Sequence, residues 1–170
     1  MNDPELRKEA LRWIRFAQED LQEAERLLGL QEAVPRHICW FAQQAAEKAL
    51  KAALVLEGID FPFRHDLDAL RNLLPPNWSV KQEHLDLSVL TAWAVEARYP
   101  GDWPEATWED AHRAVALARA IYDCEEASSI PGDPGRIRPS GLLFDLSLHP
   151  DARDGRPAGA WGIHRRKPPG

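Results

Sequence analysis

Cysteine and long apolar runs are scarce in this sequence of 170 residues. The two cysteines, Cys39 and Cys124, are too few for the disulfide framework of a small secreted domain. No apolar run approaches the roughly 20 residues that a membrane-spanning helix needs. The charged start MNDPELRKEA also lacks the apolar core of a secretory signal. We therefore expect a soluble, cytoplasmic protein that does not associate with a membrane.

Glycine is scarce too, but only in the first 130 residues. Residues 1–130 contain 3 of the 10 glycines, whereas residues 131–170 contain the other 7 together with 7 prolines. The net charge changes from −9 in the first part to +3 in the second. This composition predicts a folded domain at 1–130 and a largely unstructured Gly/Pro-rich tail at 131–170, which we expect to be dispensable for folding. The total net charge of −6 argues against a protein that coats nucleic acid through charge alone.

The common catalytic motifs are absent. The sequence has no Gly-rich phosphate loop, no HExxH, no CxxC and no nucleophile elbow. The histidines of the first 130 residues fall on four different segments, at His37, His65, His84 and His112. We expect His65 to help order a helix start beside Asp66. The sequence therefore predicts no catalytic residue, no metal site and no cofactor.

Helical periodicity is what the first 130 residues do contain. Apolar residues recur every three or four positions between 4 and 28, 36 and 57, 67 and 74, 80 and 98, and 108 and 127. The expected N-caps are Asp3, Asp66, Ser79 with Gln82, and Thr107 with Asp110. Because no strand pattern competes and the loops are short, the sequence predicts an all-α fold. We expect an antiparallel up-and-down bundle of four long helices and one short helix.

The predicted helix at 36–57 combines two apolar rows with a polar strip. The apolar rows exceed what one side of a small bundle covers, so we expect a homodimer to which this helix and residues 97–108 contribute. The strip consists of Gln43, Gln44, Glu47, Lys48 and Lys51. One interpretation is a solvated face, on which an i,i+4 pair such as Glu47 and Lys51 contributes about 0.2 to 0.5 kcal/mol. The neighbouring Trp40 favours an interface instead.

A second cluster of candidate residues lies in the segment ARYPGDWPEATW at 97–108. Arg98 can hold a phosphate or carboxylate with two hydrogen bonds, and Tyr99, Trp103 and Trp108 offer faces on which a base can stack. The alternative is that these aromatic residues only close the end of the bundle.

The sequence resembles one known family over nearly all of residues 5–127. The resemblance rests on QQAAEKALKA, the following His-Asp-Leu, ARYP at the end of the fourth predicted helix, and the last helix AHRAVALARAIYDC. In these motifs the chain is similar to the HEPN domain (higher eukaryotes and prokaryotes nucleotide-binding). The tail at 131–170 is outside the resemblance.

The resemblance implies a dimerising helical bundle with one of three roles. These are a metal-independent ribonuclease of the toxin type, a nucleotide-binding module, or the partner of a small nucleotidyltransferase in a toxin–antitoxin type system. The candidate residues for binding a nucleotide or partner are Arg98, Tyr99, Trp103, Gln44 and Lys48. A scaffold bundle without a ligand is a further alternative.

The ribonuclease pattern of the family is incomplete in this chain. Its members have an Arg, a following polar residue, and a His after four to six intervening positions. Arg98 matches the Arg, but Tyr99 follows it, and the positions for the His hold Trp103, Pro104 and Glu105. Without that imidazole, no group at this position titrates near neutral pH to move the 2′-OH proton. We therefore favour a non-catalytic HEPN module, with a ribonuclease that uses Arg98 and a base other than His as the alternative.

Overall fold

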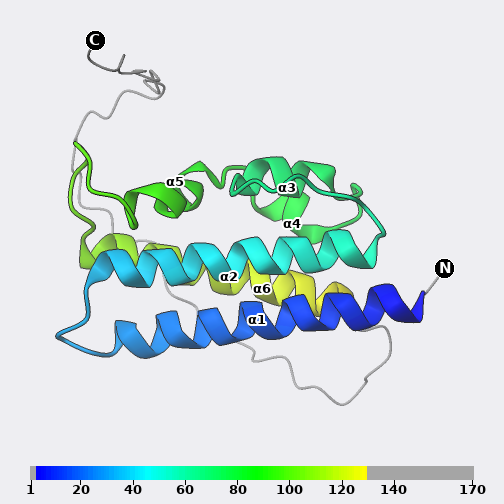
Figure 1. Cartoon of the computed structure of the whole chain (residues 1–170), viewed down its shortest axis with the longest axis horizontal. Helices are drawn as coiled ribbons and strands as arrows, with labels where there is room; N and C mark the ends of the chain where they lie inside the picture. The colour runs from blue at the N-terminus through cyan, green and yellow to red at the C-terminus, as the bar shows by residue number, and fades with distance from the viewer. Residues whose placement is uncertain (1–2, 130–170) are drawn as a thin grey trace, which may run out of the picture. The chain divides into compact units, whose positions relative to one another are not determined.

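The fold is all-α, as the sequence predicts. The computed structural model describes residues 3–129, with side chains as far as residue 124, and this part contains no strand. Its helices, labelled in Figure 1, are α1 (Pro4–Leu28), α2 (Pro35–Leu56), α3 (Leu67–Leu73), α4 (Ser79–Glu83), α5 (Ser88–Glu96) and α6 (Trp108–Ser129). The predicted tail at 131–170 lies outside the described residues, so the predicted boundary at residue 130 stays a prediction.

Side-chain caps start three of the helices at the predicted residues. Asp3 accepts a hydrogen bond from the Glu5 amide at 2.9 Å, and Asp66 accepts one from the Ala69 amide at 3.0 Å. At the start of α6, Thr107 Oγ1 accepts from the Asp110 amide at 3.1 Å, and Asp110 accepts from the Thr107 amide at 2.9 Å. The predicted cap at Ser79 is wrong: Ser79 is the first residue of α4, and Trp78 precedes it without a side-chain cap.

The predicted fourth long helix is divided into α4 and α5 at residues 84–87. Asp68, from α3, accepts a hydrogen bond from the Leu87 amide at 3.1 Å. Arg71, also from α3, donates to the carbonyl oxygen of His84 at 2.6 Å. Asp86 accepts from the Ser88 amide at 2.9 Å. These bonds satisfy backbone groups that a continuous helix would pair internally, so the break costs little. The described part therefore has three long and three short helices.

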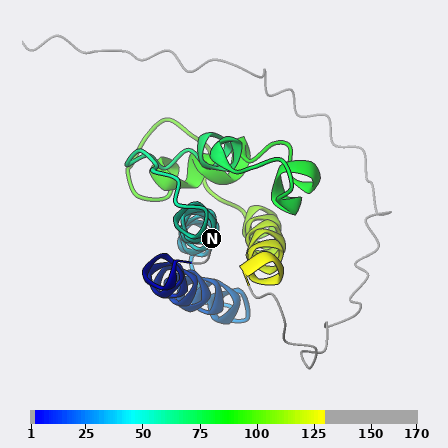
Figure 2. The ribbon, with the colours of Figure 1, turned by 90° about the vertical axis from the view of Figure 1, so that its right-hand side faces the viewer.

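Helix α2 lies at the centre of the bundle. Figure 2 shows α1, α2 and α6 side by side, with α3, α4 and α5 as a layer over α2 and α6. Helices α1 and α2 are antiparallel, as predicted. The three short helices together form the return path, so α6 runs in the same direction as α2 (Figure 1). Successive passes along the bundle therefore alternate in direction, with the return pass divided among three short helices instead of forming one long helix.

The apolar rows of α2 are covered within the same chain. Ile38, Cys39, Leu50 and Leu54 are fully buried, against α1 and α6 on some sides and α3 and α5 on others. The surplus apolar surface on which we based the expected dimer is thus not found on α2. The homodimer itself stays a prediction. None of the helices in residues 3–129 is both long and apolar enough to cross a membrane.

The small side chains of α2 set how closely its neighbours pack. Ala49 is fully buried, and Ala49→Leu should lower the free energy of unfolding by about 1 to 3 kcal/mol because the core has no space for the added atoms. Urea denaturation followed by circular dichroism measures the change. Ala116 is exposed on α6, so the control Ala116→Leu should stay within about 0.5 kcal/mol of the parent. Equal stability of the two variants would show that α2 accommodates a larger side chain.

Candidate functional site

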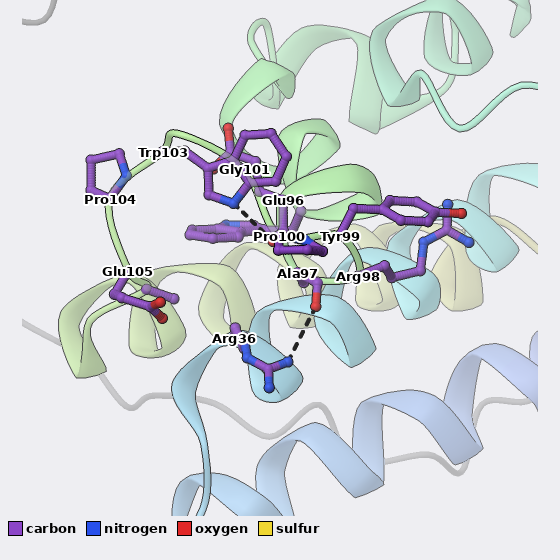
Figure 3. A pocket seen from close by; sticks show the side chains of 12 residues that line it. Arg36, Glu96, Ala97, Arg98, Tyr99, Pro100, Gly101, Trp103, Pro104 and Glu105 are labelled. Atoms are coloured by element: carbon purple, nitrogen blue, oxygen red, sulfur yellow. Dashed lines mark hydrogen bonds between the residues drawn. The ribbon is translucent and has the colours of Figure 1, made fainter.

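The segment after α5 forms a pocket of about 360 Å³ with the start of α2 (Figure 3). Three predicted site residues, Arg98, Tyr99 and Trp103, line it together. Arg36 and Glu105 line it as well. The sequence-based expectation that residues 97–108 form a cluster is therefore met for these side chains. Trp108 lies elsewhere, in a second hollow beside Leu28 and Gly29 at the end of α1.

The loop at the pocket is folded back by Trp103. The indole Nε1 of Trp103 donates a hydrogen bond to the carbonyl oxygen of Glu96, the last residue of α5, at 3.2 Å. The ring then lies directly over Gly101, where an added Cβ would be 2.4 Å from ring carbons. A glycine at this position permits the close approach of backbone and ring. The aromatic ring is thus held in the pocket wall by the local sequence.

Arg98 is exposed and leaves most of its donors available. Its Nε donates to the carbonyl oxygen of Ala94 at 2.6 Å, and its guanidinium carbon lies 5.4 Å from the centre of the Tyr99 ring. Figure 3 shows the two side chains running alongside each other. No carboxylate within residues 3–124 pairs with Arg98. A fixed, unpaired guanidinium of this kind suits a bidentate phosphate or carboxylate ligand.

Arg36 reaches the pocket from α2, with His37 beside it, and neither is among the site residues predicted from the sequence. Arg36 Nη1 donates to the carbonyl oxygen of Ala97 at 3.5 Å and lies 2.9 Å from Nε2 of His37. About sixty positions separate Arg36 from Ala97, so no local pattern in the sequence signals this proximity. The pocket therefore has a second cation, and a histidine stands beside it.

Gln44 and Lys48, the other two predicted site residues, do not line this pocket. Gln44 donates to Gln43 Oε1 at 2.7 Å, and Lys48 pairs with Asp20 of α1 while also contacting Gln44 Oε1 at 3.3 Å. Trp40, one turn before Gln44, is half-buried and packs against Phe41 with ring centres 4.9 Å apart. The five predicted site residues thus lie in two separate places: Arg98, Tyr99 and Trp103 line the pocket, whereas Gln44 and Lys48 lie further along α2.

The polar strip of α2 is largely buried, so its interpretation as a solvated face is wrong for three of five residues. Gln43, Glu47 and Lys51 are 0%, 4% and 7% exposed. Glu47 accepts hydrogen bonds from Lys51 Nζ at 2.7 Å and from Gln43 Nε2 at 2.9 Å. Burial alone would raise the pKa of Glu47, but these bonds and one from His65 outweigh burial and lower it. Glu47 is therefore ionised at neutral pH, opposite a buried ammonium.

His65 closes this buried network from the loop before α3. Its Nδ1 lies 2.9 Å from Glu47 Oε2, a contact across to α2 that the expected role at the helix start beside Asp66 does not include. Phe61, in the same loop, has its ring centre 5.6 Å from Lys51 Nζ. The ring of Trp13 on α1 lies at the same distance from Lys51. The network therefore fastens α1, α2 and the loop at 57–66 to one another.

The comparisons with known proteins agree with this architecture. Residues 10–128 match the HEPN domain, and the chain therefore belongs to the HEPN family. No curated protein matches the chain. Among solved structures, the chain is similar to an archaeal HEPN homologue, with 25% identity and a TM-score of 0.53. The similarity covers 71% of this chain and 98% of that one. The predicted family and its all-α fold are thereby confirmed.

Proposed function

We propose that this HEPN protein is a non-catalytic module that binds a nucleotide in the pocket between α2 and the end of α5. The observation that carries the proposal is the exposed guanidinium of Arg98, which is fixed by Ala94, stacked on Tyr99 and lacks a carboxylate partner within residues 3–124. It lines the same pocket as Trp103. An anion-binding group beside an aromatic face is the pair of features that a nucleotide requires.

The size and charge of the pocket are consistent with such a ligand. A volume of about 360 Å³ lies within the range of small-molecule sites, which runs from about 300 to 1,000 Å³. Arg36 and Arg98 supply cations from two different elements for the phosphate. Tyr99 and Trp103 supply the flat surfaces for a base. No cofactor or catalytic residue is needed for this role.

We further propose that the protein acts as a homodimer and pairs with a small nucleotidyltransferase, in a system of the toxin–antitoxin type. Membership of the HEPN family supports this part of the proposal. The partner would dock on the same module that binds the nucleotide.

A metal-independent ribonuclease is the second candidate function, and one residue of the pocket and one residue beside Arg36 favour it. Glu105 lines the pocket with Arg98. His37 lies 2.9 Å from Arg36 and offers an imidazole that the family's linear pattern does not supply. Against it, the Arg98 guanidinium and the Glu105 carboxylate lie at opposite ends of the pocket in Figure 3. A general base must come within hydrogen-bond reach of the proton that it removes.

RNA cleavage and nucleotide titration separate the two functions. We expect the purified full chain to leave single-stranded RNA intact in the presence of EDTA, yet to bind nucleoside mono- or triphosphates saturably in titration calorimetry. The cleavage assay should include the variants Arg98→Ala, His37→Ala and Glu105→Gln, each purified by the same procedure as the parent. The protein is a ribonuclease if the parent digests RNA, if Arg98→Ala abolishes digestion, and if at least one of His37→Ala and Glu105→Gln also abolishes it. Trace host nuclease would digest RNA equally in all preparations.

A further inference from the structure

A second cluster of functional side chains lies outside the pocket, at the break between α4 and α5. The ligand atoms of Glu83, His84 and Cys124 all lie within 4.8 Å of one another. Glu83 and His84 end α4, and Cys124 lies in α6, about forty positions further along the chain. The thiol Sγ of Cys124 lies 3.7 Å from Glu83 Oε2. The arrangement joins one sulfur, one nitrogen and one oxygen donor.

The imidazole of His84 gives a second, independent indication of a ligand. Its Nε2 is buried and has no hydrogen-bond partner in the described part of the chain. A buried ring nitrogen without a partner is costly, because it has lost water and gained nothing in return. The backbone of the same residue is held in place, since Arg71 donates to its carbonyl oxygen at 2.6 Å. The backbone of His84 is thus anchored, while the Nε2 of its ring lacks a hydrogen-bond partner within the described residues.

From this geometry we propose that Glu83, His84 and Cys124 bind a zinc ion that fastens the α4–α5 junction to α6. Zinc takes thiolate, imidazole and carboxylate ligands at about 2.0 to 2.3 Å in a tetrahedral arrangement, so two of its ligands lie about 3.6 Å apart. The spacing of 3.7 Å between Cys124 Sγ and Glu83 Oε2 already matches that separation. The mixture of a soft thiolate with imidazole and carboxylate favours zinc over magnesium or calcium. A water molecule completes the four ligands.

The sequence does not signal this site because its ligands have no motif spacing. Glu83 and His84 are adjacent, and the thiol arrives only when α6 packs beside α4. The other thiol of the chain is unsuitable, since burial raises the pKa of Cys39 to about 12 and keeps it protonated. The proposed site is independent of the nucleotide pocket, and its test does not depend on nucleotide binding.

Cobalt titration of the full chain under reducing conditions tests the proposal. Co²⁺ that binds a thiolate produces a charge-transfer band in the near ultraviolet, and we expect one equivalent to do so in the parent protein. The band should persist in Cys39→Ala and disappear in Cys124→Ser. Zn²⁺ should remove the band by competition and raise the Tm of the parent but not of Cys124→Ser. Circular dichroism establishes that both variants are folded.

Glu83→Gln provides a test that does not depend on the fold of the cysteine variants, because Glu83 is exposed. Loss of this ligand should weaken Co²⁺ binding at least 10-fold while the band remains. The proposal is overturned if the parent shows no thiolate band, if the band survives in Cys124→Ser, or if Glu83→Gln binds Co²⁺ as tightly as the parent. The histidines beyond residue 130 cannot imitate a positive result, since they carry no sulfur.

Discussion

Replacing Glu47 with Gln should lower the free energy of unfolding by about 3 to 5 kcal/mol, the loss typical when one partner of a buried ion pair is removed. The substitution preserves the shape of the side chain and removes only its charge. Lys51, which is 7% exposed, is then left with a buried ammonium that faces a neutral amide at position 47 and the rings of Trp13 and Phe61, with no counter-charge. Those rings offset only part of the lost ion pair, since a cation–π contact is worth about 0.5 to 2 kcal/mol.

The chain offers a matched control on α6. Glu109 and Arg113 form a pair with the same i,i+4 spacing, but each side chain is 71% exposed. Glu109→Gln should therefore change the free energy of unfolding by at most about 1 kcal/mol. Urea denaturation compares the two variants under identical conditions. The double variant Glu47→Gln/Lys51→Met should recover much of the loss, because no unpaired charge remains. Equal costs for Glu47→Gln and Glu109→Gln would show that the α2 network is not buried in solution.

The effect of Glu47→Gln should also depend on pH, with a sign fixed by the lowered pKa. Glu47 has a lower pKa in the folded chain than its ordinary value of 4.5. Its ionised form therefore stabilises the fold fully above pH 4.5, and this stabilisation is lost as the pH falls through the lower folded pKa. The difference between parent and variant should be constant near neutrality and shrink in acid.

Features encoded by neighbouring residues could be predicted from the sequence. The three long helices and the caps at Asp3, Asp66 and Thr107 depend on apolar periodicity and on side chains two or three positions away. Such signals are complete within one turn of helix. The loop at 97–106 could be predicted as a cluster for the same reason, because Arg98 and Trp103 are close along the chain.

Features that depend on distant residues could not be predicted in this way. The break at 84–87 is stabilised by Asp68 and Arg71 of α3, which no reading of residues 79–98 includes. The polar strip of α2 has the spacing of an ordinary surface face, and only the packing of α1 and the loop at 57–66 buries it. Arg36 likewise joins the pocket through tertiary structure alone. In each case the deciding contact is long-range.

The resemblance to a known family groups Gln44 and Lys48 with Arg98, although the structure places them apart from the pocket. The resemblance to the HEPN domain marks QQAAEKALKA as characteristic, but a family motif does not distinguish a ligand contact from a contact that maintains the fold. Lys48 pairs with Asp20 of α1, and Gln44 hydrogen-bonds Gln43. These contacts support a structural role for both residues, because they hold α2 against α1 and orient its side chains.

If the pocket binds a nucleotide as proposed, Arg98→Ala should weaken binding by roughly 1.5 to 3 kcal/mol, the contribution of a hydrogen bond to a charged group. That loss corresponds to roughly a 10- to 150-fold higher Kd, at 1.4 kcal/mol for each factor of 10. The guanidinium is exposed and, within the described residues, makes one backbone hydrogen bond, to Ala94, so its removal should leave the free energy of unfolding nearly unchanged. Titration calorimetry with the nucleoside triphosphate that binds the parent most tightly measures the effect.

Two further variants determine whether the loss belongs to the pocket. Arg98→Lys retains the charge but cannot form the paired hydrogen bonds of a guanidinium, so its Kd should lie between those of the parent and of Arg98→Ala. Lys48→Ala removes a cation of equal charge that is already paired with Asp20 and does not line the pocket, so its Kd should change less than that of Arg98→Ala. A larger effect for Lys48→Ala would place the nucleotide beside Lys48 and Asp20, where α1 meets α2. Unchanged binding in Arg98→Ala would overturn the proposed function, because no other guanidinium that lines the pocket within residues 3–124 is both exposed and stacked on an aromatic ring.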